Sequence, residues 1–151
     1  MPSRASRLIP AAPDAVYRAF TDPVALIEWL PPGEMTGQIH AFDGRVGGGY
    51  EMSLYYPPGE DHTPGKTAAH EDRVNVRFVE LDPPRRIVQA VTFQTDDPAI
   101  KGEMTMAITL QAAAGGTLVA LEFDNLPPGV RPEDNDEGAR LSLDQLAARF
   151  A

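Results

Sequence analysis

The chain has 151 residues, with 22 acidic and 13 basic side chains and a net charge of −9, which disfavours binding to nucleic acid or anionic lipid. The absence of cysteine excludes disulfides, thiolate catalysis and cysteine-ligated metals, and fits a reducing compartment. No apolar run approaches the roughly 20 residues of a membrane span, and the start of the chain has no apolar signal core. We therefore expect a single cytoplasmic domain over residues 1–151, without membrane contact.

The beginning of the chain predicts one strand and two short helices. Residues 3–9 are a strand candidate. Pro13 suits the first turn of a helix whose apolar residues repeat as far as Phe20, and Pro23 begins a second helix that Asp22 caps and Pro31 ends. Neither helix is long enough to be stable alone, so both should pack against the rest of the domain.

The middle of the chain, from residue 35 to residue 126, predicts an antiparallel sheet. Apolar residues there alternate with a period of two, and turn residues recur at strand-length intervals. A polar loop is expected over residues 57–69. The six strands expected in this region cover residues 38–42, 50–56, 73–81, 86–94, 103–111 and 117–124.

Two hairpins allow the strand register to be predicted. A turn centred between Ala114 and Gly115 gives the pairs Leu110 with Val119, Ile108 with Leu121, and Met106 with Phe123. A turn through Pro83 and Pro84 gives the pairs Val76 with Val91, Val74 with Phe93, and Phe78 with Gln89. Gln89 is therefore expected to face inward. The opposite face carries Val79 and Val88, which the two short helices could cover.

The last element is an amphipathic helix over residues 132–150, whose acidic amino end complements the helix dipole. The apolar stripe consists of Ala139, Leu143, Leu146, Ala147 and Phe150, whereas Arg140, Ser142, Asp144, Gln145 and Arg149 point elsewhere. Leu141 lies about 200° around the helix from Ala139, on the polar side. It could mark a homodimer contact.

Several short motifs in this order resemble the START-like superfamily, also called SRPBCC or Bet v-like. They are RLIPAAPDAVYRAFTDP at residues 7–23, WLPP at 29–32, GGGY at 47–50, GGT at 115–117 and GARLSL at 138–143. The last three resemble in particular the bacterial branch named for activators of the Hsp90 ATPase. The resemblance implies an α+β helix-grip fold. In this fold a strongly bent antiparallel sheet of about seven strands wraps around the long carboxy-terminal helix, and two short helices follow the first strand.

The same resemblance implies that a cavity often lies beneath the long helix. In many members of the family that this chain resembles, the corresponding motif contains Gly-Trp, whereas this chain has Gly138 and Ala139. A large side chain missing from a close-packed interior leaves a costly void unless something fills it. The space at Ala139 is therefore either a ligand pocket or core filled by neighbours such as Trp29 or Phe123, and both alternatives stay open.

The expected binding site is an apolar inner surface with a few polar groups. Gln89 and Tyr50 are its polar members, since a buried amide needs a hydrogen-bond partner, which can be a ligand, a backbone group or water. The methionines could adapt to a ligand or simply fill the core. The expected ligand-binding residues are Trp29, Tyr50, Met52, Leu54, Val76, Phe78, Gln89, Val91, Phe93, Met104, Met106, Ile108, Leu121, Phe123, Ala139 and Leu143.

The sequence predicts no catalytic residue, metal ion or cofactor. His40, His62 and His70 form no metal-ligand motif. Residues 134–138 are better explained as a charged helix start than as a calcium loop, and residues 44–49 as a hairpin turn rather than a phosphate loop. Other polar strand residues lack a recognisable partner or are expected to face solvent, namely Ser53, Glu51, Glu103 and Glu122.

These features predict a protein that binds a small, largely hydrophobic molecule in a cavity between the sheet and the carboxy-terminal helix, with no reaction specified. Two alternatives stay open. The protein could be an enzyme of the aromatase, cyclase or hydrolase type, which a second polar or titratable group near Gln89 would favour. It could also be a co-chaperone-like module that contacts a chaperone through its surface, although no motif indicates ATP hydrolysis by the chain itself.

Overall fold

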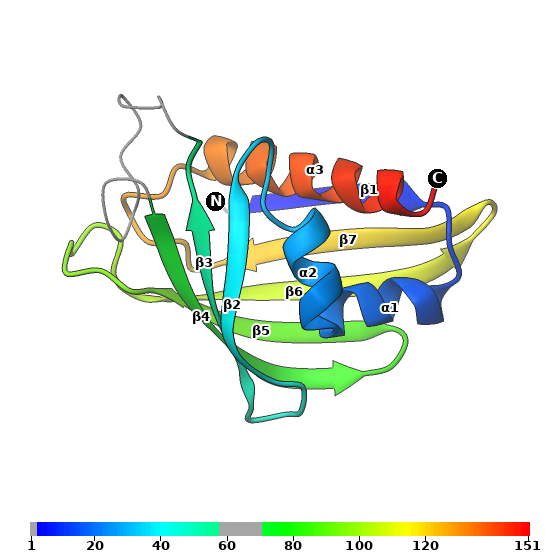
Figure 1. Cartoon of the computed structure of the whole chain (residues 1–151), viewed down its shortest axis with the longest axis horizontal. Coiled ribbons are helices and arrows are strands. Elements are labelled where there is room, and N and C mark those ends of the chain that lie inside the picture. The colour runs from blue at the N-terminus through cyan, green and yellow to red at the C-terminus, as the bar shows by residue number, and fades with distance from the viewer. Residues whose placement is uncertain (1–2, 58–70) are drawn as a thin grey trace.

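The computed structural model describes residues 3–57 and 71–151, whose arrangement is shown in Figure 1. Two short helices, α1 (Pro13–Thr21) and α2 (Pro23–Trp29), follow the first strand, and a long helix, α3 (Pro132–Arg149), comes last. The strands are β1 (Ser3–Ile9), β2 (Thr36–Asp43), β3 (Gly49–Tyr55), β4 (Glu71–Asp82), β5 (Arg86–Phe93), β6 (Glu103–Ala113) and β7 (Gly116–Asp124). The expected α+β helix-grip class is confirmed. The predicted polar loop lies almost wholly outside the described residues.

All seven strands form one antiparallel sheet in the order β1-β7-β6-β5-β4-β3-β2. Both predicted hairpin registers are confirmed. Paired residues of neighbouring strands point to the same side of a sheet, so they form rows across it. One row, here called the Gln89 row, runs through Ser3, Phe123, Met106, Gln89 and Phe78. The face that carries this row is called the inner face, and the opposite face the outer face.

Polar contacts attach α3 to β1 on the inner face, and Figure 1 shows the two elements side by side. The hydroxyl of Ser3 contacts the carboxylate of Asp136, and Asn135 Nδ2 donates a 2.9 Å hydrogen bond to Ser3 Oγ. Further along, Arg7 forms a 2.6 Å ion pair with Asp144. The predicted apolar stripe of α3 is buried or partly buried in the core. The amino-terminal half of α3 therefore lies at the Ser3 end of the Gln89 row.

Two polar residues of α3 join this helix to the end of α2. Ser142 is buried, and its hydroxyl donates a 2.6 Å hydrogen bond to the backbone oxygen of Leu30. Gln145 Nε2 donates to the backbone oxygens of Trp29 and Pro31, at 2.7 and 2.8 Å. The prediction that Ser142 points away from the core was wrong. Helical periodicity separates polar from apolar positions, but it does not reveal which backbone carbonyls of another element lie nearby.

The helices α1 and α2 also lie on the inner side of the sheet. Val16, Phe20 and Trp29 belong to the same hydrophobic cluster as the inner-face strand residues. Trp29 Nε1 donates a 2.9 Å hydrogen bond to the backbone oxygen of Ala19, which satisfies the buried indole. Because neither helix covers the outer face, Val79 remains 43% exposed there. The expectation that these helices would make Val79 a core residue was wrong.

The glycine-rich segment between β2 and β3 forms a hairpin turn that extends the contact with β4. The Gly47 N–H donates to the backbone oxygen of Phe78, and the Phe78 N–H donates to Gly48, both at 2.9 Å. A Cβ atom on Gly49 would lie 1.8 Å from the backbone oxygen of Val76. Glycine is required there because the two backbones approach closely.

Candidate functional site

The sixteen predicted ligand-binding residues converge on the inner side of the sheet. Fifteen of them are hydrophobic or aromatic and belong to one core cluster or pack directly against it. The sixteenth, Gln89, is buried between its row neighbours Phe78 and Met106. The structure thus brings the predicted residues together, and their role in binding stays a prediction.

The inner side is not filled equally everywhere. Met52, Phe78 and Ile108 have no exposed surface, whereas Met106 and Phe93 are only partly buried. Met106 is a particular case, because it lies on β6, inside the sheet, and points inward. Protein interiors are normally packed at the density of organic crystals. Met106 is thus an inward-facing residue in the middle of the sheet that keeps accessible surface.

The small side chain of Ala139 lies near the Ser3 end of this row. Asp136 contacts Ser3, and Ala139 follows Asp136 by about one helical turn on the buried side of α3. Ala139 is 9% exposed. A short residue at this position limits how far α3 can reach towards Met106.

Gln89 is the polar centre of the inner face. Its side chain is 1% exposed, and Oε1 is the one buried side-chain N or O atom among the described residues that has no hydrogen-bond partner. The Gln89 amide lies beside the phenol of Tyr50. Burial raises the pKa of Tyr50, and a hydrogen bond from the Gln89 side chain acts in the opposite direction. Tyr50 therefore keeps its proton at neutral pH, and the carbonyl of Gln89 faces the interior without a donor.

A second polar pair on the inner face was missed by the sequence analysis. Asp72 shares a face with Val74, Val76 and Phe78 on β4, is 4% exposed, and accepts a 2.8 Å hydrogen bond from the Tyr56 hydroxyl. Burial, followed by the charge of Asp72, raises the pKa of Tyr56. The alternation of β4 could have placed Asp72 inward. The predicted strand began one residue later, at position 73, so Asp72 was left out.

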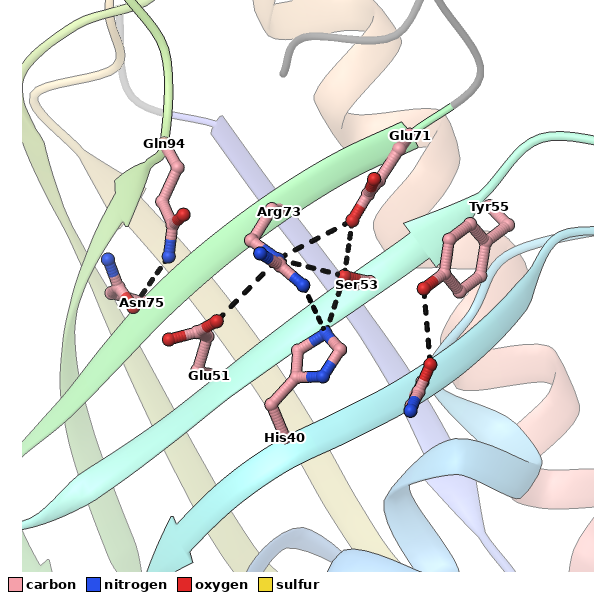
Figure 2. Close-up of polar contacts among 9 residues, drawn as sticks. His40, Glu51, Ser53, Tyr55, Glu71, Arg73, Asn75 and Gln94 are labelled. Atoms are coloured by element: carbon pink, nitrogen blue, oxygen red, sulfur yellow. Dashed lines mark hydrogen bonds and ion pairs between the residues drawn. The ribbon is translucent and has the colours of Figure 1, made fainter. Parts of the chain in front are cut away.

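On the outer face, polar side chains of β2, β3 and β4 surround Ser53 (Figure 2). Ser53 is completely buried, and its hydroxyl lies 2.5 Å from Glu71 Oε2 and 2.8 Å from His40 Nε2. Arg73 donates from Nε to Ser53 Oγ at 3.2 Å and contacts His40 Nε2 at 2.9 Å. The sequence analysis found no base for Ser53, because His40 comes from a neighbouring strand.

This outer-face cluster does not have the geometry of an activated nucleophile. The Ser53 hydroxyl has one proton to donate, and a carboxylate is a stronger acceptor than a neutral imidazole, so the proton goes to Glu71. The lone pair of His40 Nε2 accepts from Arg73, and no carboxylate within residues 3–57 and 71–151 orients His40. Glu51 and Glu71 each lie 3.5 Å from Arg73 Nε, so two carboxylates face this guanidinium. The cluster holds three strands together and leaves Ser53 without access to a substrate.

Two open surface hollows lie away from the sixteen residues. One, of about 460 Å³, is bordered by the segment between β7 and α3, including Asn125, Pro128 and Val130. The other, of about 430 Å³, lies between α2 and the edge strand β2 and includes Val24, Ile27 and Phe42. Neither hollow is lined by any predicted ligand-binding residue.

Within residues 3–57 and 71–151, no group of three or more His, Asp or Glu side chains is placed to hold a metal ion. His62 and His70 lie outside this part of the chain. None of the described helices is both long and apolar enough to span a membrane.

The sequence matches the family described as activator of Hsp90 ATPase homolog 1-like proteins over residues 10–151. The chain belongs to this family. A solved Chromobacterium violaceum protein is 33% identical, with a TM-score of 0.84 over 99% of this chain and 96% of that chain. An AHSA1-like protein from Aeromonas hydrophila is 19% identical, with a TM-score of 0.71 over 98% and 90%. A Rhodobacter sphaeroides protein is also 19% identical, with a TM-score of 0.77 over 98% and 90%. A search of curated proteins gives no match.

Membership of the AHSA1-like family confirms the START-like resemblance on which the fold prediction rested. It names no ligand and no catalytic residue. The inner face around Gln89 and Met106 is therefore the candidate site on the geometry of this chain alone.

Proposed function

We propose that this protein binds a small, largely apolar molecule on the inner face, between the sheet and α3, without transforming it. The observation that carries this proposal is the accessible surface of Met106 beside the buried amide of Gln89. An apolar surface with a few polar groups is the usual composition of a small-molecule site. Methionine side chains are flexible and polarisable, so Met104 and Met106 suit an adaptable pocket wall.

The expected affinity follows from the apolar area that a ligand would lose to solvent. A ligand that buries about 200 Å² of apolar surface gains roughly 5 kcal/mol before the cost of association is subtracted. Apolar contact alone therefore gives weak binding, and a polar contact is needed to make binding selective.

The test is native mass spectrometry of the folded protein incubated with mixed lipids and small aromatic compounds. We expect a one-to-one complex with at least one compound. Met106→Trp should fill the space beside the Gln89 row and remove the complex, whereas Thr109→Trp, on the exposed outer face of the same strand, should retain it. Absence of every complex with the wild-type protein, together with a solid interior in a crystal structure, would contradict the proposal.

The enzymatic alternative is not proposed, because the groups near Gln89 do not provide a general base. The raised pKa of Tyr50 keeps its phenol protonated at neutral pH. Asp72 lies six residues from Phe78 along β4, which corresponds to roughly 20 Å. A single small substrate would therefore not contact both the Gln89 row and the carboxylate of Asp72.

A further inference from the structure

We propose that Gln89 selects the ligand: Oε1 accepts a hydrogen bond from an uncharged ligand that carries an O–H or N–H donor on an aromatic or otherwise apolar body. The inference rests on the binding function proposed above and goes beyond it, because it assigns the chemical class of the ligand and the residue that recognises it.

The side chain of Gln89 is not fully satisfied by the described part of the chain. The carbonyl oxygen of a primary amide accepts up to two hydrogen bonds, yet Oε1 is buried without a donor among the described residues. Its row neighbours on either side are Phe78 and Met106, and neither side chain has a donor to offer. Buried polar groups are satisfied in most proteins, so a buried acceptor without a donor among the described residues is a candidate contact for a bound molecule.

A ligand that packs against Met106 and displaces neighbouring side chains would approach Gln89, which is buried directly beside it. Gln89 and Met106 are directly paired across β5 and β6, and Met106 keeps accessible surface. Tyr50 also lies beside the Gln89 side chain, whose amide acts to lower the pKa of the phenol. The Gln89 carbonyl, which has no donor among the described residues, is the polar group that a molecule bound against Met106 would contact.

The lining of the candidate site disfavours a charged ligand. None of the sixteen predicted site residues is charged, so a charged ligand would be desolvated without a compensating partner. An anion would in addition meet an unpaired carbonyl oxygen. These features favour a neutral donor such as a phenol, an indole or a secondary amide.

The experiment compares probes that differ only in the donor. Isothermal titration calorimetry of the full chain uses three pairs: phenol and anisole, indole and N-methylindole, naphthol and methoxynaphthalene. In at least one pair we expect the donor-bearing probe to bind roughly 10-fold more tightly, because its methylated partner leaves Oε1 unpaired. Gln89→Leu should abolish this preference and retain binding of the methylated probe. Gln38→Leu, on the exposed outer face of β2, should keep the wild-type preference.

The outcomes separate this inference from the proposed function. Equal affinities within every pair that binds the wild-type protein would overturn the role of Gln89 and leave binding on the inner face intact. A preference of Gln89→Leu for the donor-bearing probe would also overturn the role of Gln89. Binding of none of the six probes would overturn the proposed function and this inference together. If Gln89→Leu does not fold, Gln89→Met, which is closer in shape, takes its place, and the wild-type comparison needs no variant at all.

Discussion

Ser142 of α3 donates a 2.6 Å hydrogen bond to the backbone oxygen of Leu30, at the carboxyl end of α2. The last carbonyl groups of a helix have no partner within that helix. Gln145, on the next turn of α3, binds the neighbouring carbonyls of Trp29 and Pro31. Together the two side chains fix α2 against α3 and close this side of the candidate site.

Ser142→Ala should lower the free energy of unfolding by about 1–3 kcal/mol, because it leaves the carbonyl of Leu30 without a donor at a buried contact. Urea unfolding measures the effect. Arg140→Ala, on the exposed side of the same helix, should change stability by less than about 0.5 kcal/mol. Equal stability of Ser142→Ala and the wild-type protein would show that the contact does not hold α2 in place.

Ser53→Ala tests the outer-face cluster. We expect a loss of about 0.5–1.5 kcal/mol in unfolding free energy, because Glu71, His40 and Arg73 lose a shared partner but can reach solvent. Binding on the inner face should be unchanged. Ser6→Ala, at an exposed position of β1, is the matched control and should be neutral. Loss of ligand binding in Ser53→Ala would contradict a purely structural role for this cluster.

The buried phenol of Tyr50 predicts a loss of stability at alkaline pH. An unfolded tyrosine loses its proton near pH 10, whereas the raised pKa of Tyr50 keeps the proton in the folded state. The contribution of the buried Tyr50 phenol to the free energy of unfolding is therefore complete below about pH 10. Above this pH it declines by at most about 1.4 kcal/mol per pH unit. Urea unfolding between about pH 9 and pH 11 should show a shallower decline for Tyr50→Phe. If the free energy of unfolding depends on pH in the same way for the wild-type protein and Tyr50→Phe, the predicted role of the Tyr50 phenol is contradicted.

Ala139→Trp tests whether the interior near α3 is open. If space lies beside the Gln89 row, the ring should fit at a cost below about 1 kcal/mol and should block ligand binding, instead of causing the 1–3 kcal/mol loss of overpacking. Urea unfolding and native mass spectrometry measure the two effects. Ala148→Trp, on the exposed side of α3, should leave binding unchanged. Unfolding of Ala139→Trp, or ligand binding equal to wild type, would indicate filled core at this position.

The fold was predictable because its signals are local or pairwise. Period-two alternation located the strands, and the matching of apolar partners set the pairing of Phe78 with Gln89 and of Met106 with Phe123. The inward direction of Gln89 followed from that register. The family resemblance supplied what periodicity cannot, namely that one sheet wraps around α3.

The parts that sequence reasoning missed depend on contacts between distant segments. Ser142 meets Leu30 across 112 positions, so no helical pattern could reveal its partner. His40 reaches Ser53 across the pairing of β2 with β3, which contains an irregularity between Ile39 and Ala41. The short helices follow apolar faces but do not specify a side of the sheet, which is why Val79 was placed wrongly.

Carbon-13 labelling of methionine methyl groups gives the most direct test of ligand binding on the inner face. Met52, Met104 and Met106 point into this face, whereas Met35 lies in the segment before β2 and serves as the internal reference. On addition of naphthol we expect the Met106 methyl signal to shift most, the Met104 signal to shift less, and the Met35 signal to stay in place. Saturation with no shift at Met104 or Met106, or a shift confined to Met35, would contradict binding between the sheet and α3.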